Sequence, residues 1–471
     1  MATLTERIFR ATPSPFKDAL CSLYGWRLHR SRYGRRERDA FLDELRREEF
    51  LNVQDAARLS IERLRATLVR VCAEVPYYRE LFANLKIDPA HLPLPEGLEQ
   101  IPILEKATIR ERPKDFISEA VNRQSLETRE TSGTTGSPMP VRVDKASLRR
   151  NYAYYNLFRA RAGTAVGRRR ATFNGRVICS AARRRPPFWV RDWTENNLLF
   201  SVYHISPATA DAYLERLRRF APQEIHAYPS ALLTLARHAR AGGQALPHPE
   251  CLIVSAESLG ADDRAFLSEA FACPVFNQYG NAEMTLFAGD CTEGRLHVET
   301  GYSFVEIPGA LPDAQGRLTG DIVTTGFVNR AMPLIRYRMG DTVTLTSDPC
   351  PCGRVTPVLQ EVAGRTDDLL ILPDGRQIGR MDPVFKGLIG LDEVQIIQES
   401  IQRVRLDVVP AAGYGPRSEK ELHRAVADRL GAGVEIIIRQ VENIPRTAGG
   451  KFRAVIRLFT PPDPPAGLPP L

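Results

Sequence analysis

The sequence predicts an α/β protein with a large, multi-sheet N-terminal domain and a small α+β C-terminal domain. In the middle of the chain, the apolar runs 251–258 and 274–280 flank the amphipathic segment 261–272. This strand–helix–strand order is typical of a sheet whose ligand loops lie at the strand ends. After Gly364-Arg365 the pattern changes to short strands around one helix, which indicates a separate compact unit.

The length and composition are those of a globular protein with more than one domain. The chain has 471 residues, of which 43% are hydrophobic and 25% charged, so a disordered or fibrous protein is excluded. It contains no apolar stretch of about 18 residues. The beginning, MATLTERIFRATPSPFK, lacks the apolar run of a secretory signal. We therefore expect a cytoplasmic protein without a membrane segment.

Basic residues exceed acidic residues only slightly. The chain has 64 Lys and Arg against 56 Asp and Glu, which gives a net charge of +8. The arginine clusters at 168–170 and 183–185 could hold phosphates, but solvated loops are the commoner setting for such runs. Aromatic residues are not interleaved with them as in single-strand binding proteins. We therefore expect no nucleic-acid partner.

The N-terminal part of the chain is expected to be helical. Residues 1–64 are rich in Arg, Glu and Leu and form the predicted helical extension. The segment 56–75 carries apolar residues at helical spacing and is stopped by Pro76, so it predicts a helix of about four to five turns. Residues 65–366 then form the expected large domain, in which strands alternate with helices.

The small domain is expected over residues 367–459. The segments 369–379, 393–400 and 403–410 are predicted strands. A predicted helix, 418–430, and a final predicted strand, 434–441, follow them. The last residues, 460–471, are a proline-rich tail that we expect to be disordered.

The strongest local signal is a run of hydroxyl-bearing residues and glycines that ends in Ser137-Pro138. Its central residues are Thr131, Ser132, Gly133, Thr134, Thr135 and Gly136. Glycines allow close backbone approach, and N–H and O–H donors can surround phosphate oxygens. The composition also fits a flexible linker, but the run lies inside an otherwise folded region. It lacks the ending of a Walker loop, and a phosphate-binding loop is the favoured interpretation.

Four further motifs follow this loop in order. They are Tyr279-Gly280-Asn281-Ala282-Glu283, Tyr337-Arg338-Met339-Gly340-Asp341, Gly364-Arg365-Thr366-Asp367-Asp368 and Pro445-Arg446-Thr447-Ala448-Gly449-Gly450-Lys451. Their order and spacing resemble the adenylate-forming (ANL) superfamily of acyl-CoA ligases, peptide-synthetase adenylation domains and luciferases. Three other segments are similar to its phenylacetate-CoA ligase and capsule-biosynthesis-associated branch: 75–82, 101–104 and 256–258.

The resemblance implies that the large domain is an adenylation domain and the small domain its mobile lid. The loop 131–136 would hold the β- and γ-phosphates of ATP. Ser255, Ala256 and Glu257 would line the adenine. Tyr279, followed by Gly280, would stack on the adenine, because an aromatic face suits a flat heterocycle.

The remaining motifs are implied to hold the metal, the ribose and the reacting groups. Glu283 would help to hold Mg²⁺, a hard cation that favours carboxylate oxygen. Asp341 would accept hydrogen bonds from the ribose hydroxyls, with Arg365 nearby. Lys451 would bridge the substrate carboxylate and the α-phosphate; without the resemblance it would be a solvated loop lysine. Asp367 matches the hinge of the lid and would otherwise belong to an exposed acidic pair.

One position departs from the pattern of the superfamily. Many relatives place a lysine after the proline of the Thr-rich loop, whereas this chain has Met139-Pro140. That region varies within the phenylacetate branch, so we interpret the difference as a trait of a subgroup.

Three cysteines and one histidine form a candidate zinc set. Cys291 precedes His297, and Cys350-Pro351-Cys352 follows later in the chain. Three thiols and one imidazole suit tetrahedral Zn²⁺, and four protein ligands would make the site structural rather than catalytic. The alternative is that Cys-Pro-Cys caps a tight turn and His297 packs on a strand. Zinc is the favoured interpretation, because some members of this branch carry a structural metal on a comparable set.

The resemblance implies a two-step, ATP-dependent ligase. A carboxylate would attack ATP to give an acyl-adenylate and pyrophosphate, and a thiol, CoA, would then displace AMP. The alternative keeps the first step without CoA, as an adenylyltransferase or an acyl transferase to an amine or carrier in polysaccharide or cofactor biosynthesis. The segment 374–388 departs from the ligase pattern, which puts CoA use in question. A catalytically silent scaffold is opposed by the joint retention of Glu283, Asp341, Arg365 and Lys451.

The sequence does not identify the small carboxylate substrate. Candidate pocket segments are 152–155, 173–175 and 226–229. Their Tyr and Phe residues suit an aromatic acid and equally suit ordinary core packing. The oligomeric state also stays open, although relatives on this branch are often homodimers.

Overall fold

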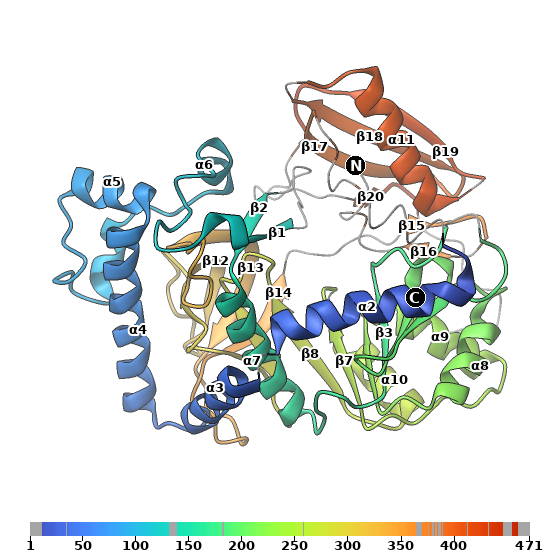
Figure 1. The fold of residues 1–471 in the computed structure, drawn as a ribbon, viewed down its shortest axis with the longest axis horizontal. Helices are drawn as coiled ribbons and strands as arrows, with labels where there is room; N and C mark the ends of the chain where they lie inside the picture. The colour runs from blue at the N-terminus through green and yellow to red at the C-terminus, as the bar shows by residue number, and fades with distance from the viewer. Residues whose placement is uncertain are drawn as a thin grey trace.

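The structure is a computed structural model that describes residues 12–33, 35–130, 139–180, 183–257, 259–363, 370–374, 376–378, 381, 384, 388, 390–411, 413–431, 433–445 and 455–459. Figure 1 shows a large domain built around one long sheet and a small C-terminal domain with a sheet of its own. The proline-rich tail 460–471 lies outside the described residues.

Helices begin the described chain. They are α2 (Ser14–Arg32), α3 (Arg35–Glu48), α4 (Val53–Glu74) and α5 (Pro76–Leu85). The helix predicted over 56–75 is confirmed as most of α4, which Asn52 caps by accepting a hydrogen bond from Asp55 N. Pro76 ends α4 and begins α5, because proline lacks the N–H that a helix interior needs and fits a first turn. The expected boundary after residue 64 falls inside α4.

Short elements connect these helices to the main sheet. They are η1 (Glu96–Gln100), α6 (Lys106–Glu111), η2 (Arg123–Ser125), β1 (Glu127–Glu130), β2 (Pro140–Val143) and α7 (Lys145–Arg161). β1 and β2 pair antiparallel with Glu130 opposite Pro140, so the two strand ends that flank the Thr-rich run lie side by side. The side chain of Asp144 caps α7 by accepting a hydrogen bond from Ser147 N.

The centre of the main sheet is parallel. Its strands, in spatial order, are β8 (Val275–Gly280), β7 (Cys251–Ser255), β6 (Glu224–Ala227), β3 (Arg170–Asn174) and β5 (Asn197–Ser201), with β4 (Trp189–Asp192) antiparallel at the edge. The connecting segments contain η3 (Val202–His204), α8 (Ala210–Phe220), α9 (Pro229–Ala241) and α10 (Ala261–Phe271). The predicted strand–helix–strand unit is confirmed as β7, α10 and β8. The carboxyl ends of these strands therefore meet at one edge.

The other half of the sheet is antiparallel. It contains β9 (Phe287–Asp290), β10 (Leu296–Val298), β14 (Val358–Ala363), β13 (Tyr337–Thr346), β12 (Leu318–Gly326) and β11 (Ser303–Glu306), in that spatial order after β8. One apolar core lies between this half and helices α4 and α7. A second core lies around α8, α9 and α10. The boundary between the two cores runs along β7 and β8.

The small domain has a four-stranded sheet in the order β19-β18-β17-β20. Its elements are β15 (Leu370–Ile371), β16 (Gln377–Ile378), β17 (Leu391–Ser400), β18 (Arg403–Pro410), α11 (Pro416–Leu430), β19 (Glu435–Gln440) and β20 (Val455–Arg457). The predicted strands 393–400, 403–410 and 434–441 and the helix 418–430 are confirmed. The segment 369–379 forms two short paired strands, because a turn at Pro373-Asp374 interrupts it.

The small domain docks on the large domain at Tyr203. This tyrosine packs into the apolar core of the small domain, and the Arg429 guanidinium lies 4.6 Å from the centre of its ring. Arg376 is 4% exposed and donates hydrogen bonds to Tyr203 O (2.8 Å) and Leu430 O (2.6 Å). One buried guanidinium thus ties the two domains together.

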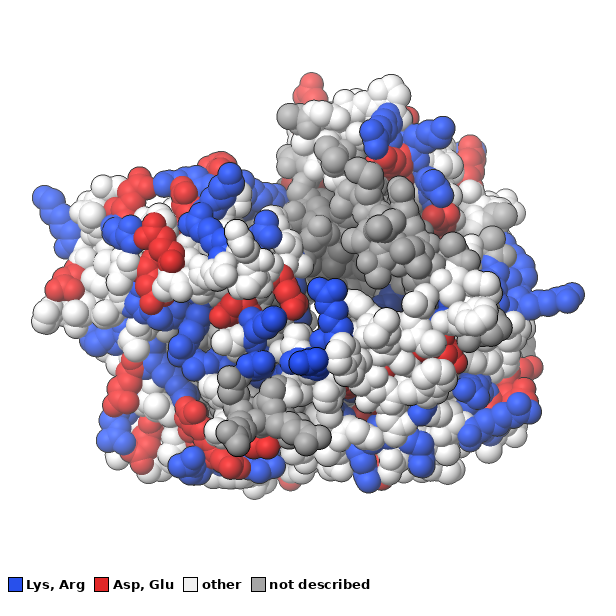
Figure 2. Space-filling model, in the orientation of Figure 1, with Lys and Arg blue, Asp and Glu red and all other residues white. Residues whose placement is uncertain are grey.

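Two surface properties complete the description. No helix among the described residues combines the length and the apolar character that a bilayer crossing requires. On the face shown in Figure 2, Lys and Arg side chains are interspersed with Asp and Glu over the large domain.

Candidate active site

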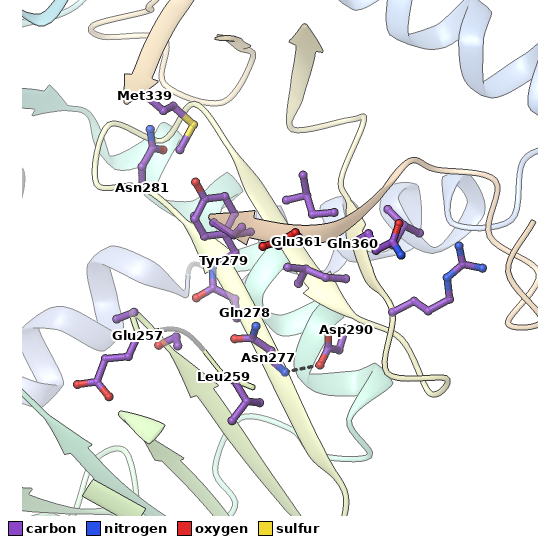
Figure 3. Close-up of a pocket in the computed structure, with 18 of the residues that line it drawn as sticks. Glu257, Leu259, Asn277, Gln278, Tyr279, Asn281, Asp290, Met339, Gln360 and Glu361 are labelled. Atoms are coloured by element: carbon purple, nitrogen blue, oxygen red, sulfur yellow. Dashed lines mark hydrogen bonds between the residues drawn. The ribbon is translucent and has the colours of Figure 1, made fainter. Parts of the chain in front are cut away.

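A cavity of about 1040 Å³ opens at the carboxyl ends of β7 and β8. Its walls come from these strands, the β9–β10 connection, β13, β14 and the start of α6. Figure 3 shows two strands in this wall. Strand β8 contributes Asn277, Gln278 and Tyr279, and β14 contributes Gln360 and Glu361, which face them. The cavity therefore lies where open α/β sheets place their ligands.

The turn after β8 holds Glu283 at this cavity. A Cβ on Gly280 would lie 2.8 Å from Leu286 O, so a larger residue would force the backbone apart. Asn281 Oδ1 accepts hydrogen bonds from Thr285 N (2.9 Å) and Leu286 N (3.3 Å), and Asn281 Nδ2 donates to Thr285 Oγ1 (2.7 Å). These side-chain bonds close the turn locally, and Glu283 sits within it.

Glu283 is 5% exposed and has two partners among the described residues. Tyr337 Oη donates to Glu283 Oε1 (2.8 Å), and Lys106 Nζ lies 3.6 Å from the same oxygen. Both contacts involve Oε1, and a carboxylate oxygen is the kind of ligand that a hard cation such as Mg²⁺ prefers. Sequence reasoning missed Lys106, which lies just after the matched segment 101–104; that proximity was the only available signal.

Tyr279 and Asp341 meet beside this carboxylate. Tyr279 Oη donates to Asp341 Oδ2 (2.6 Å), which joins the end of β8 to β13. Asp341 is 2% exposed, whereas the Tyr279 ring forms part of the cavity wall. The bond fixes the ring, so its flat face is available to stack on a heterocycle.

The segment after β7 lines the opposite side of the cavity. Ala256 has φ +75°, a left-handed conformation that is uncommon for a residue with a Cβ. Glu257 turns its carboxylate to the start of α9, where it accepts hydrogen bonds from Ser230 N (2.9 Å) and Ser230 Oγ (3.0 Å). A negative charge at a helix N-terminus is stabilising. Ser255, Ala256 and Glu257 all line the cavity, and their expected contact with adenine stays a prediction.

The other expected site residues lie outside the described residues. They are Thr131, Ser132, Gly133, Thr134, Thr135, Gly136, Arg365, Asp367 and Lys451. Their expected roles stay predictions.

A second cavity of about 360 Å³ adjoins the first, and Gln278, Gly280 and Asn281 line both. Four residues from the expected pocket segments line it: Tyr152, Tyr155, Asn174 and His226. Phe173 instead stacks on Phe200 in the core, with ring centres 4.5 Å apart. The core-packing alternative thus holds for Phe173.

Comparison with known proteins matches both parts of the chain. Residues 370–458 match the CapK C-terminal domain family. Protein CapK of Staphylococcus aureus is 24% identical over 95% of this chain and 98% of its own length. Phenylacetate-coenzyme A ligase of Thermus thermophilus is 26% identical over 88% of this chain and 98% of its own length.

Among solved structures, a 2-hydroxyisobutyryl-CoA ligase in complex with 2-HIB-AMP and CoA has the same fold. Its TM-score is 0.57 and its identity 21%, over 88% of this chain and 92% of that one. The chain is therefore similar to CapK and to the phenylacetate-CoA ligases over most of its length, and it shares the fold of an acyl-CoA ligase.

In this chain, the four predicted metal ligands lie close together. Their ligand atoms all lie within 4.8 Å of one another. Cys291 Sγ is 3.8 Å from Cys350 Sγ, and Cys352 Sγ is 3.6 Å from His297 Nε2. Tetrahedral Zn²⁺, with bonds of about 2.3 Å to sulfur and about 2.0 Å to nitrogen, would place these atom pairs about 3.8 and 3.5 Å apart. The four side chains therefore fit zinc, and the sulfur separation is far too long for a disulfide.

The histidine of this set presents the correct nitrogen. His297 Nδ1 lies 3.1 Å from Thr356 O, a carbonyl that can only accept, so Nδ1 carries the proton. The lone pair of Nε2 then faces Cys352. Burial lowers the pKa of His297 to about 4, which keeps the imidazole neutral. Burial also raises the pKa of Cys291 to about 11, a thiol that metal binding would deprotonate.

Proposed function

We propose that the protein activates a carboxylic acid with ATP and then transfers the acyl group to the thiol of CoA. The observation that carries this proposal is the meeting of two superfamily motifs, 279–283 and 337–341, at one cavity. Tyr279, Glu283 and Asp341 come from β8, the turn after it and β13, and they assemble near the carboxyl end of the parallel sheet. The phenylacetate-CoA ligase relatives support the thiol as acceptor.

In the first step, a carboxylate oxygen attacks the α-phosphorus of ATP. The bond from this phosphorus to the bridging oxygen breaks, pyrophosphate leaves, and an acyl-adenylate forms. Tyr279 stacks on the adenine and Asp341 accepts from the ribose hydroxyls. Glu283, held by Tyr337 and Lys106, ligates Mg²⁺, which neutralises phosphate charge. Lys451 places a positive charge between the two approaching anions.

In the second step, the sulfur of CoA attacks the acyl carbon of the adenylate. The bond from this carbon to the AMP oxygen breaks, AMP leaves, and a thioester forms. We assign the change of lid orientation between the two steps to Asp367. The phosphate contacts belong to the loop 131–136 and the contact beside the ribose to Arg365.

We also assign Zn²⁺ to Cys291, His297, Cys350 and Cys352, in a structural role. Four protein ligands leave no open coordination position for a substrate. The site ties the β9–β10 hairpin to the segment before β14, next to one wall of the nucleotide cavity. We place the reaction in the cytoplasm, where ATP and CoA are available.

The direct test is ATP–pyrophosphate exchange with purified full-length protein, Mg²⁺ and a panel of carboxylic acids. Exchange that depends on one acid and is lost in Glu283→Gln supports the first step. Adding CoA should then yield AMP and a thioester of matching mass. Exchange without a thioester, but with an acylated amine, would favour the CoA-independent alternative. No exchange with any acid would contradict the enzymatic assignment.

A further inference from the structure

The second cavity is continuous with the nucleotide cavity at the end of β8. Gln278, Gly280 and Asn281 line both spaces. An acid whose carboxylate reaches the nucleotide at this junction must place the rest of its acyl group in the second cavity. At about 360 Å³, this space lies at the small end of the ligand-pocket range.

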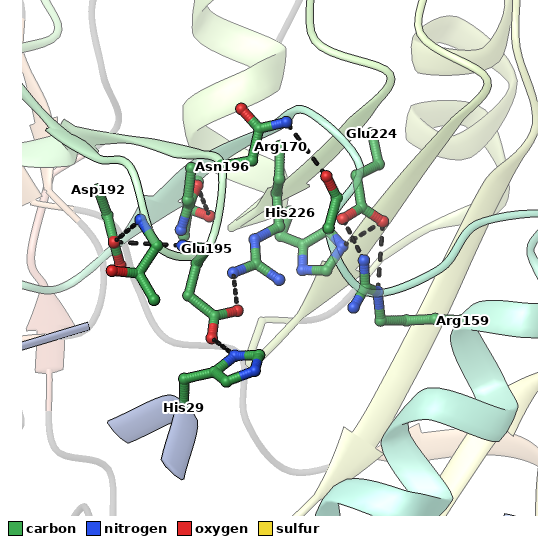
Figure 4. Close-up of polar contacts among 12 residues, drawn as sticks. His29, Arg159, Arg170, Asp192, Glu195, Asn196, Glu224 and His226 are labelled. Carbon is green, nitrogen blue, oxygen red and sulfur yellow. Dashed lines mark hydrogen bonds and ion pairs between the residues drawn. The ribbon is translucent and has the colours of Figure 1, made fainter. Parts of the chain in front are cut away.

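The walls of this cavity are charged rather than apolar. Its ionisable lining residues, apart from tyrosines, are Arg32, Arg170, Arg176, Asp192, Glu195 and His226. Figure 4 shows two groups of polar contacts, one that joins His29, Glu195 and Arg170 and one that joins His226, Glu224 and Arg159. Both groups contain basic and acidic side chains, so the cavity has no single-sign field. A phenyl ring or an alkyl chain placed here would desolvate these groups without compensating them.

One side of the cavity offers an acceptor. His226 Nε2 lies 3.3 Å from Glu224 Oε2 but makes no hydrogen bond in this geometry. We assign the proton of the neutral imidazole to Nε2, because a lone pair there would face the lone pairs of the carboxylate oxygen. His226 Nδ1 then accepts from Tyr155 Oη at 2.9 Å. Because the Tyr155 proton is committed to His226, the phenol oxygen can offer the cavity only its lone pairs. It suits an O–H or N–H donor on the ligand.

Arg170, which lines the same cavity, offers donors. The Arg170 side chain is 13% exposed, and its closest carboxylate oxygen is Glu195 Oε2, 3.6 Å from Nη2. This separation allows an ion pair but exceeds a hydrogen bond. Among the described residues, the buried Arg170 Nε has no hydrogen-bond partner, and the other carboxylate oxygen of Glu195, Oε1, lies 2.7 Å from His29 Nδ1. Buried donors left without acceptors are costly, and a ligand oxygen would satisfy them.

We propose that the acyl substrate is a small hydroxylated carboxylic acid, whose hydroxyl groups bind between Tyr155 and Arg170. A hydroxyl group both donates and accepts, which matches an acceptor and a donor in the lining of one cavity. The inference rests on the proposed adenylation and names its substrate class. It distinguishes this chain from an enzyme for aryl or alkyl acids.

The test compares matched acids with the full-length protein: gluconate against hexanoate, and glycerate against propionate, with phenylacetate as an aryl acid. We expect kcat/KM for pyrophosphate exchange to be at least about a hundredfold higher for the hydroxylated member of a pair, because a site built to bind a hydroxyl rejects the analogue that lacks it. A preference for hexanoate, propionate or phenylacetate would overturn the inference while leaving adenylation intact.

Two variants locate the recognition. Tyr155→Phe keeps the ring and removes the oxygen, and Arg170→Met keeps the length and removes the donors. Each should lower kcat/KM for the preferred hydroxylated acid by about tenfold or more and leave that for its apolar partner within about twofold. Arg168→Met is the matched control, since Arg168 pairs with Glu250 at the surface. Equal losses for both acids of a pair would contradict the assigned contacts.

Calorimetric titration of gluconate and hexanoate into wild type and Arg170→Met separates the two proposals. Gluconate could bind more tightly than hexanoate to wild type and lose this advantage in Arg170→Met, while no acid supports pyrophosphate exchange. That result would support the proposed hydroxyl-binding pocket and contradict the adenylation assignment. Equal binding of both acids, or binding of neither, would contradict the substrate class.

Discussion

Lys451 is assigned to a single chemical event, the approach of a carboxylate to the triphosphate. Loss of one preorganised charge of this kind costs about 10²–10³ in rate. We expect Lys451→Ala to lower pyrophosphate exchange by that factor and to keep ATP binding in equilibrium dialysis, because Tyr279 and Asp341 belong to the large domain. Lys420→Ala, on the exposed face of α11, is the control. Near wild-type exchange in Lys451→Ala would refute the assignment.

His226 makes stability depend on pH. Burial lowers the pKa of His226 to about 4; Arg170 and Arg159 act in the same direction, and Glu224 opposes them. The unfolded chain, with a histidine pKa of about 6.5, binds the proton first as the pH falls. The contribution to stability is therefore complete above about pH 6.5 and is lost as the pH falls towards 4.

Urea unfolding of wild type and His226→Asn at pH 7 and pH 5 measures this contribution. The wild type should lose about 2 kcal/mol more than the variant over this interval, on the order expected for the difference between the two pKa values. The comparison cancels His204 and His297, whose pKa values burial also lowers. Identical losses in the two proteins would show that His226 is not held neutral.

Some residues of the candidate site can be recognised from a sequence motif, whereas others are found only from their contacts in the folded chain. Glu283 and Asp341 could be predicted because each lies in a short motif whose order along the chain is specific. Lys106 and Arg170 could not, because α6 and β3 bring them to the cavities from remote parts of the sequence. Tyr155 lies in a pocket segment that the sequence indicated, but the acceptor role that we propose for it depends on which nitrogen of His226 carries the proton.

The β9–β10 hairpin and the loop before β14 depend on each other through the four metal ligands. Binding free energy at a site assembled by folding is also folding free energy. We expect the double substitution Cys350→Ser and Cys352→Ser to abolish bound zinc and to lower Tm by roughly 5–10 °C, at about 2–4 °C per kcal/mol. The exchange rate of the folded fraction should change little, since none of the four ligands lines the nucleotide cavity within the described residues.

Elemental analysis of wild type purified without chelator checks the assignment directly. One equivalent of zinc is expected. Cys72→Ser is the matched control, because Cys72 lies on α4 outside the cluster. Less than a tenth of an equivalent of zinc or any other transition metal would contradict the metal assignment and support the alternative, in which Cys-Pro-Cys caps a turn and His297 packs on a strand.

At the scale of elements, the spacing of apolar residues predicted those helices and strands whose formation depends mainly on the local sequence. The helix over 56–75 and the unit from β7 to β8 have long apolar patterns that end at Pro76, Gly260 or Gly280, and each is found as expected. The convergence of the metal ligands depends instead on the pairing of β10 with β14. That pairing joins segments far apart in the chain, so spacing along the sequence could not reveal it.

Asp367 is expected to act at the scale of the whole molecule, as the point about which the small domain turns. Proline there fixes φ near −65° and removes a donor, so Asp367→Pro should trap one orientation of the lid. We expect one half-reaction, measured by pyrophosphate exchange or by thioester formation from acyl-AMP, to persist while the other falls by at least about tenfold. Asp367→Ala keeps the backbone free and is the control. If Asp367→Pro keeps the wild-type rates of both half-reactions, the hinge assignment is contradicted.

Helix α2 and Tyr33 form part of the wall of the second cavity. A Cβ on Gly25 would lie 2.2 Å from Asp192 Oδ2, and His29 contacts Glu195 in the same wall. If the acyl-adenylate forms as proposed, we expect this segment to limit the access of water to the mixed anhydride, which water hydrolyses. A chain shortened to begin after Tyr33 should still consume ATP, but water should hydrolyse a larger share of the acyl-adenylate. The ratio of AMP released to thioester formed should then rise above one, and this ratio measures how well the segment excludes water from the intermediate.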